Sequence, residues 1–333
     1  MNYFVIFMKA VVTGGAGFIG SHLVDLLLEN NYSVTVIDNL STGRLKNIEH
    51  ALNLINFIEA DLSIMNSTWI EHIRTADYIF HLASLADIVP SIENPISYFQ
   101  SNVTATANIL GTINARNIKK FVYAASSSCY GIAKYFPTNE SHPISPEYPY
   151  AMTKWLGEEL VLHWTKVYGL SAVSTRFFNV YGTRSRTSGT YGAVFGVFLA
   201  QKLASKPFTV VGDGTQMRDF TYVSDVCRGM LLAAESNISG EIFNIGSGKP
   251  HSINKLVQLL GGDVVNISKR PGEPEKTHAD ITKAREILGY KPVVNFETGV
   301  DKVLANIEYW AEAPVWTPES INKATQEWFD RLS

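Results

Sequence analysis

The chain has 333 residues, of which 46% are hydrophobic, enough for a buried core in one large or two modest domains. A net charge of −3 and a pI of about 6.3 argue against the basic surface of a nucleic-acid-binding protein. No stretch approaches the roughly 20 apolar residues that span a bilayer, so we expect no membrane partner. Two cysteines give no disulfide framework and indicate a reducing, cytoplasmic location.

The eight histidines show no H-x-x-x-H spacing, and we predict no metal. Residues 1–7 are apolar but carry no basic region or cleavage site, so we find no targeting signal there.

The first half of the chain alternates between apolar runs and helical periodicity, which is typical of parallel βαβ units. Long helices are predicted over about 97–116 and 150–168. The runs are hydrophobic almost throughout, as expected when helices cover both faces of a sheet. The predicted strands are Lys9–Thr13, Ser33–Ile37, Asn56–Glu59, Tyr78–Leu82, Phe121–Ala125 and Ser171–Phe177. The pattern predicts an α/β fold with a Rossmann-type, doubly wound parallel sheet.

A glycine-rich turn follows the first strand. Gly14, Gly17 and Gly20 match G-x-x-G-x-x-G, and Gly15 with the last two also matches G-x-G-x-x-G. Such glycines let the backbone turn sharply and approach a pyrophosphate, while the helix behind them, predicted over His22–Glu29, offers free N–H groups. Asp38 ends the second strand about twenty residues later, where an acid binds the adenosine ribose hydroxyls and repels a 2′-phosphate. The sequence therefore predicts NAD as the cofactor, although nearby Arg44 leaves some NADP tolerance open.

A second group of residues indicates acid–base chemistry. Tyr150 and Lys154 lie one turn apart at the start of a predicted helix. We expect the cation to lower the pKa of the phenol, which makes Tyr150 a base near neutral pH. The fifth strand ends in three serines, Ser126 to Ser128, whose hydroxyls face the cofactor crevice because ligands bind beyond the carboxyl ends of such strands.

The second half of the chain is irregular, with frequent Gly and Pro and shorter elements. We assign residues 8–180 to an NAD-binding Rossmann domain, to which 213–250 partly returns, and 181–333 mainly to a smaller, mixed α/β substrate-binding lobe. C-terminal helices are predicted over about 296–311 and 318–332. Their tryptophans are expected to be packing anchors rather than ligand contacts, and they are Trp310, Trp316 and Trp328.

Together these motifs resemble the extended short-chain dehydrogenase/reductase family, and more narrowly its nucleotide-sugar epimerases and dehydratases. The resemblance runs from Lys9 to about Phe329. It rests on Thr13–Gly20, Asp38-Asn39, Asp61-Leu62, His81-Leu82-Ala83, Ser126–Gly131, Tyr150/Lys154, Arg176–Gly182, Arg218-Asp219-Phe220 and Arg270-Pro271-Gly272-Glu273.

The resemblance implies a role for each matching residue. The implied catalytic residues are Ser126, Tyr150 and Lys154. Those implied to bind NAD are Gly14, Gly17, Phe18, Ile19, Gly20, Asp38, Asn39, Asp61, Leu62, Leu82, Ala83 and Ser84, with Tyr150 and Lys154. Those implied to bind a UDP-sugar are Ser126, Asn179, Arg218, Arg270, Glu273 and Thr277. Two arginines from separate segments also suit a diphosphate on chemical grounds, because each can bind it in bidentate fashion.

The residues after Ser126 bear on the reaction. The family's 4,6-dehydratases carry Asp then Glu where this chain has Ser127 and Ser128, so elimination of water lacks its acid and base. We therefore predict a 4-epimerase acting on UDP-glucose and UDP-galactose: Tyr150 takes the C4 hydroxyl proton, hydride passes to NAD⁺, and the 4-keto sugar turns over before reduction. A dehydratase, a 4-ketoreductase, an epimerase at another carbon and a non-enzymatic NAD-sensing scaffold are the alternatives.

Three further expectations follow from the resemblance. Small Thr277 borders the sugar 2-substituent, where a bulky tyrosine accompanies plain hexoses, so N-acetylated sugars are sterically admitted. The polar loop Ser185–Gly192 is placed to cover the nucleotide. A homodimer is expected through a four-helix bundle formed by 97–116 and 150–168, with Trp155, Leu162 and Trp164 as contributors unless they serve the core.

Overall fold

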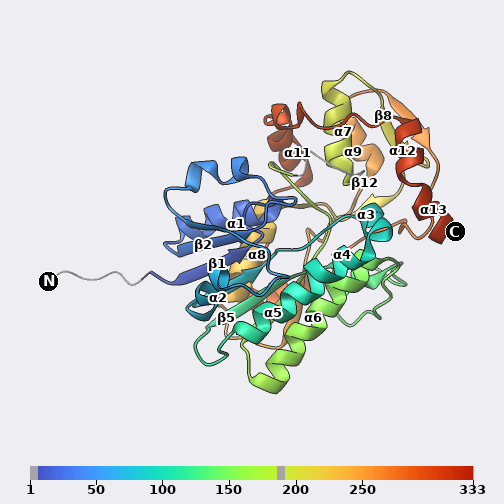
Figure 1. Ribbon diagram of the computed structural model, residues 1–333. Helices are drawn as coiled ribbons and strands as arrows, with labels where there is room; N and C mark the ends of the chain where they lie inside the picture. The colour runs from blue at the N-terminus through green and yellow to red at the C-terminus, as the bar shows by residue number, and fades with distance from the viewer. Residues whose placement is uncertain (1–6, 186–191, 333) are drawn as a thin grey trace.

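The computed structural model describes residues 7–185 and 192–332. Within them, seven parallel strands form a central sheet in the order β11-β6-β5-β4-β1-β2-β3 (Figure 1). The strands are β1 (Lys9–Thr13), β2 (Ser33–Asp38), β3 (Asn56–Glu59), β4 (Tyr78–His81), β5 (Lys120–Ser126), β6 (Ala172–Phe177) and β11 (Glu241–Ile245). Strand order reverses between β1 and β4, and the carboxyl ends of strands at such a switch point are where ligands bind. The predicted fold class is confirmed, and each of the six predicted strands lies within one residue of the observed bounds.

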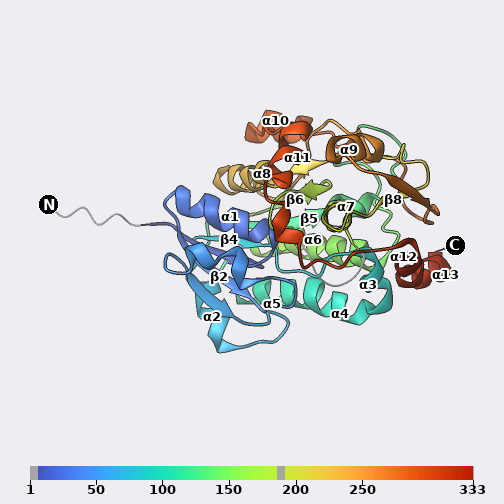
Figure 2. The ribbon, with the colours of Figure 1, turned by 90° about the horizontal axis from the view of Figure 1, so that it is seen from above.

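Helices cover both faces of the sheet, because neighbouring residues of a strand point to opposite sides. Val12 packs into a core with Leu23 of α1 (Phe18–Glu29) and Met230 of α8 (Val223–Glu235). Val11 packs instead with Trp69 of α2 (Ser67–Arg74). That second core also includes residues of α5 (Ala105–Thr112) and α6 (Pro149–Tyr168), and Figure 2 shows the two helical layers from above.

Much of the chain beyond β6 builds a smaller lobe beside the carboxyl edge of the sheet (Figure 1). Its helices are α7 (Val194–Leu203), α9 (Ile253–Leu260), α11 (Phe296–Leu304), α12 (Pro318–Ala324) and α13 (Gln326–Leu332). Its strand pairs are β8 (Phe208–Val211) with β13 (Val264–Ile267), and β9 (Met217–Arg218) with β12 (His251–Ser252). A third pair, β7 (Val180–Tyr181) with β10 (Thr221–Tyr222), leads into α8, while α10 (Thr282–Leu288) contacts β11. Strand β11 belongs to the central sheet, and helix α8 packs against this sheet. We therefore keep the proposal that residues 213–250 partly return to the NAD-binding domain.

Several helix bounds differ from the sequence prediction. Helix α1 begins at Phe18, four residues before the predicted start, because Gly17 serves as its N-cap. The predicted helix 97–116 is α4 (Pro95–Phe99), a π-helical turn η3 (Gln100–Thr104) and α5, which ends at Thr112. The helix predicted over 296–311 is the shorter α11, which ends at Leu304 and is followed by a 3₁₀ turn. The helix predicted over 318–332 is two helices, α12 and α13, separated by Thr325.

One twenty-residue helix, α6, is the longest in the described part of the chain. None of the helices in those ranges combines the length and the apolar character needed to cross a bilayer. Helix α3 (Ile88–Glu93) and the turn η4 (Ser127–Tyr130) follow β4 and β5, and both border the functional site.

Candidate active site

The glycine turn between β1 and α1 is packed too tightly for side chains. Gly14 has φ +71°, and a Cβ there would lie 2.7 Å from the Ala83 nitrogen. A Cβ on Gly20 would lie 2.1 Å from the Gly14 carbonyl oxygen, so the first turn of α1 rests directly on the loop. Gly14 is the residue of the turn with positive φ, so its backbone conformation favours the first glycine of the G-x-x-G-x-x-G spacing.

The N-terminus of α1 suits an anionic group. Gly17 provides no side-chain cap, and the first turn carries no acidic residue, so the N–H groups there stay available for a pyrophosphate. Asp38 lies beside the loop and accepts hydrogen bonds from the Ala16 and Leu40 nitrogens, 3.0 and 2.8 Å away. Each carboxylate oxygen keeps a lone pair for a ribose hydroxyl. Burial raises the pKa of Asp38, which these backbone hydrogen bonds oppose. The glycine turn, the helix end and the acid thus fit NAD.

Two further segments lie beside the glycine turn and extend the proposed NAD site. The Asn39 amide donates to Asp61 (3.2 Å), and hydrogen bonds from Ser63 and Asn39 lower the pKa of Asp61 despite its partial burial. On the other side of the turn, the Thr13 hydroxyl accepts from the nitrogens of Leu82 and Ala83, both 3.2 Å away. The β4 loop is thereby fixed against the glycines.

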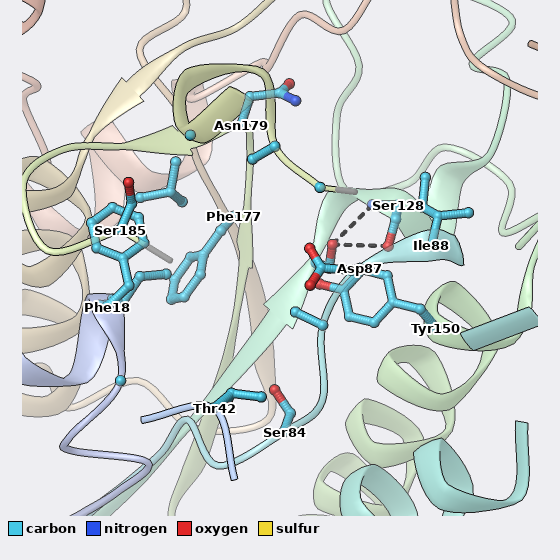
Figure 3. A pocket seen from close by; sticks show the side chains of 18 of the residues that line it. Phe18, Thr42, Ser84, Asp87, Ile88, Ser128, Tyr150, Phe177, Asn179 and Ser185 are labelled. Atoms are coloured by element: carbon cyan, nitrogen blue, oxygen red, sulfur yellow. Dashed lines mark hydrogen bonds between the residues drawn. The ribbon is translucent and has the colours of Figure 1, made fainter. Parts of the chain in front are cut away.

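The proposed catalytic groups meet at the carboxyl end of β5. Ser126 ends that strand, and its Oγ accepts hydrogen bonds from the Ser128 nitrogen (3.2 Å) and hydroxyl (2.8 Å). Tyr150 follows the N1 residue of α6, Pro149, and interacts through a hydrogen bond with Ser126. Figure 3 shows Tyr150 beside Ser128 and Asp87. One turn further along α6, the Lys154 ammonium lies 4.6 Å from the centre of the Tyr123 ring.

The electrostatics of this group correct the sequence expectation. Burial raises the pKa of Tyr150; the hydrogen bond with Ser126 lowers it only in part, and the charge of Asp87 raises it further. Burial also lowers the pKa of Lys154 to about 7, which Glu158 opposes. The expected lowering of the Tyr150 pKa by Lys154 is therefore wrong for the protein alone, because a dehydrated site disfavours both charged forms.

Two residues that the sequence analysis missed shape this end of the site. Asn102 occupies the π-helical turn, where its amide bonds Leu85 through both main-chain groups (2.8 and 3.0 Å) and donates to the Thr153 hydroxyl (3.0 Å). It thus joins the loop after β4 to helix α6. Asp87 adopts φ +79°, a region that L side chains rarely enter, and such strain concentrates at functional sites. A π-helical turn and a strained aspartate leave no pattern in a single sequence.

The residues proposed to hold the substrate lie across the cavity. Glu273 pairs with both arginines: its Oε1 is 2.9 Å from Arg218 Nη2 and its Oε2 is 3.5 Å from Arg270 Nη1. Oε2 accepts no hydrogen bond from the described residues, as fits an oxygen that receives a ribose hydroxyl. The Thr277 hydroxyl donates to the Asn179 side-chain oxygen (2.6 Å) and accepts from the Asp219 nitrogen (3.0 Å).

Asp219 and two of the C-terminal tryptophans also help to form the site, which the sequence analysis did not predict. Asp219 is fully buried and accepts hydrogen bonds from the main-chain nitrogens of Ser247, Gly248 and Ala279, so it anchors the strand that carries Arg218. Trp310 is a fully buried core residue, as expected, whereas Trp316 and Trp328 also line the cavity.

The predicted site residues surround one cavity of about 660 Å³. Every residue assigned to NAD, catalysis or substrate lines it, from the glycine turn and Asp38 through Tyr150 to Arg270. Within residues 7–185 and 192–332, no cluster of His, Cys, Asp and Glu could hold a metal ion. Of the loop predicted to cover the nucleotide, 186–191 lie outside the described residues, while Ser185 and Gly192 border the cavity.

Comparisons with known proteins agree with this architecture. Residues 10–246 match the NAD dependent epimerase/dehydratase family. A putative UDP-glucose 4-epimerase from Methanocaldococcus jannaschii is 38% identical over 88% of this chain and 96% of its own. The crystal structure of a UDP-glucose 4-epimerase from Thermotoga maritima with UDP-glucose has 34% identity and a TM-score of 0.83, covering 92% of this chain and 99% of that one.

A third similar protein acts on a different sugar. It is a UDP-glucuronic acid 4-epimerase from Bacillus cereus, solved with UDP-glucuronic acid and NAD, with 33% identity and a TM-score of 0.82 over 90% of this chain and 99% of that one. Both solved structures share the fold, and their substrates differ at C6 of the sugar. The matched residues and the site geometry lead to one conclusion: this chain is an enzyme of the NAD-dependent epimerase/dehydratase family.

Proposed function

We propose that this enzyme is a 4-epimerase that interconverts UDP-glucose and UDP-galactose through a transient 4-keto sugar, with room for their N-acetyl forms. The observation that carries the proposal is the meeting of Ser126, Tyr150 and Lys154 in the cavity of the glycine turn. Serines at 127 and 128 offer no acid or base for removing water. The relatives that act on UDP-glucose support the choice of sugar.

The chain's own groups account for the proton transfers. Bound NAD⁺ supplies a reversible hydride acceptor, and its positive charge favours the phenolate that burial alone disfavours. Tyr150 takes the proton of the C4 hydroxyl and later returns it, with the Ser126 hydroxyl hydrogen-bonded to both oxygens. Lys154 holds the nicotinamide ribose. Arg218 and Arg270 grip the diphosphate while the hexose turns, so remote binding energy retains the intermediate.

The substrate range can be measured directly. Purified enzyme is incubated with UDP-glucose, UDP-N-acetylglucosamine and UDP-glucuronic acid in parallel, without added NAD, and the products are identified by NMR. We expect the C4 epimer of the first two. Loss of water would indicate a dehydratase. A separate incubation with NADH and a 4-keto-sugar nucleotide tests for a ketoreductase, which would oxidise NADH in proportion to product. Failure with every N-acetylated sugar would reject the proposed role of Thr277.

Tyr150→Phe tests the catalytic assignment. Removing the phenol should lower kcat by about 10²–10⁴-fold, the usual contribution of a general base. Tyr148→Phe is the matched control: Tyr148 lines the same cavity and stacks on Tyr150 at 6.5 Å, yet we assign its hydroxyl no proton to transfer. Near-normal turnover by Tyr150→Phe would contradict the mechanism.

A homodimer and a cytoplasmic location complete the proposal. Exposed apolar residues lie on α4 and α6, where Ile96 is 69%, Phe99 47% and Met152 41% exposed. Such a surface suits a partner helix pair. Of the predicted contributors, Trp155 and Trp164 pack against this chain's own core clusters, so core packing accounts for part of their burial. The location rests on two free, buried cysteines.

A further inference from the structure

The C-terminal helix α13 closes one side of the cavity. It packs against α3, and both views show the two helices side by side (Figures 1 and 2). Trp328 is its buried centre at 2% exposure, where it joins Val89 and Ile92 of α3 in an apolar cluster. On the side that faces α3, the contacts of the indole ring are ordinary apolar packing.

The other side of the indole contacts the segment that carries Arg270. Trp328 Nε1 donates a hydrogen bond to the Pro271 carbonyl oxygen at 2.8 Å. The Arg270 guanidinium carbon lies 5.5 Å from the centre of the Trp328 ring, within the range of a cation–π contact. A single side chain therefore fixes both the main chain and the charged group of this segment.

The same segment connects to the rest of the proposed diphosphate site. Glu273 pairs with Arg270 and also with Arg218, which comes from strand β9. Arg270 and Arg218 are nearly buried, with side-chain exposures of 10% and 9%. The position of Arg270 thus depends on Trp328 behind it and on Glu273 beside it.

We propose that Trp328 is a positioning residue for nucleotide binding, which holds the Arg270–Glu273 segment in the conformation that receives the substrate diphosphate. This inference rests on the proposed function, because it takes UDP as the nucleotide. A segment that is already ordered loses less entropy on binding, so its contacts contribute more to affinity. Its hydrogen bond and its cation–π contact are both to the Arg270 segment, so we expect its loss to weaken nucleotide binding rather than the proton transfers at Tyr150.

The test compares UDP affinity among variants of the full chain. Trp328→Ala removes both contacts and should raise the Kd for UDP about tenfold, while Trp328→Phe keeps an aromatic ring and should raise it about threefold. KM for the UDP-sugar should rise in parallel, with kcat within about twofold of wild type. Calorimetry gives Kd, and the NAD content of the purified protein should not change.

Two controls separate positioning from packing. Ile92→Ala trims the same apolar cluster without touching the Arg270 segment, so it should lower Tm and leave Kd for UDP within about twofold. Glu327→Gln changes an exposed ion pair with Arg331 on the same helix and should alter neither quantity.

Each outcome is decisive. If Trp328→Ala lowers Tm but binds UDP like wild type, Trp328 is a packing residue and the inference is overturned. If Trp328→Ala does not fold, Trp328→Phe decides: an unchanged Kd overturns the inference and a raised Kd supports it. If wild-type enzyme binds no UDP, the proposed function and this inference both fail, whereas unchanged affinity in the variants rejects the inference alone.

Discussion

At the scale of single residues, burial sets the charge of the proposed catalytic pair. Tyr150 and Lys154 lie four positions apart on α6, a spacing that predicts a phenol activated by its ammonium neighbour. In the folded protein the site is dehydrated, so the pKa of the phenol rises and that of the ammonium falls to about 7. The spacing of the two residues is visible in the sequence, but the dehydration that reverses the effect depends on tertiary packing.

The lowered pKa of Lys154 has a consequence for stability. The folded protein holds this pKa at about 7 against an ordinary 10.5, so between those values the unfolded chain binds more protons and wild-type stability rises with pH. Lys154→Met removes this titration. Its gain in Tm over wild type should therefore be largest near pH 7 and shrink toward pH 10, measured on NAD-free protein. A Tm difference that stays constant across this range would contradict the assignment.

At the scale of elements, the turn and helix that begin the fold act as one unit. Gly20→Ala would place a methyl group 2.1 Å from the Gly14 carbonyl oxygen and force α1 away from the turn. We expect a loss of about 1–3 kcal/mol in unfolding free energy and a purified protein depleted of NAD. Ser21→Ala is the matched control, because it changes the next residue of the same helix and removes only a hydrogen bond to the Phe18 carbonyl. Calorimetry and NAD content measure both; normal NAD content in Gly20→Ala would show that the contact is unimportant.

Helices and strands can be predicted from the sequence where a local pattern of apolar residues determines them. Strand β1 has the predicted bounds because a doubly covered parallel strand is a short apolar run. The helix predicted over 97–116 contains the turn η3, from which Asn102 reaches the distant Leu85 and Thr153. The predicted site residues do share one cavity, but the pairing of Glu273 with Arg218 and the contact of Trp328 with Arg270 join segments far apart in the chain. Tertiary contacts of this kind leave no periodic trace.

At the scale of the whole molecule, the exposed apolar surface on α4 and α6 predicts assembly. Phe99→Asp should convert the proposed dimer to a monomer, because a charge at the centre of an apolar interface loses its hydration. Ile287→Asp is the control, since Ile287 is exposed to a similar degree, 46%, on α10. Light scattering coupled to size-exclusion chromatography gives the mass. A monomeric wild type, or a Phe99→Asp variant that remains dimeric, would reject this interface.

We propose that one sheet edge holds a cofactor, an acid–base pair and a nucleotide sugar for a reaction without net redox. UDP-galactose carrying deuterium at C4, incubated with purified enzyme and no added NAD, distinguishes this reaction from the alternatives. We predict UDP-glucose that retains deuterium at C4, with no NADH released, because the same hydride leaves and returns within one site. Loss of the deuterium, or product formed only in proportion to added NAD⁺, would contradict the account.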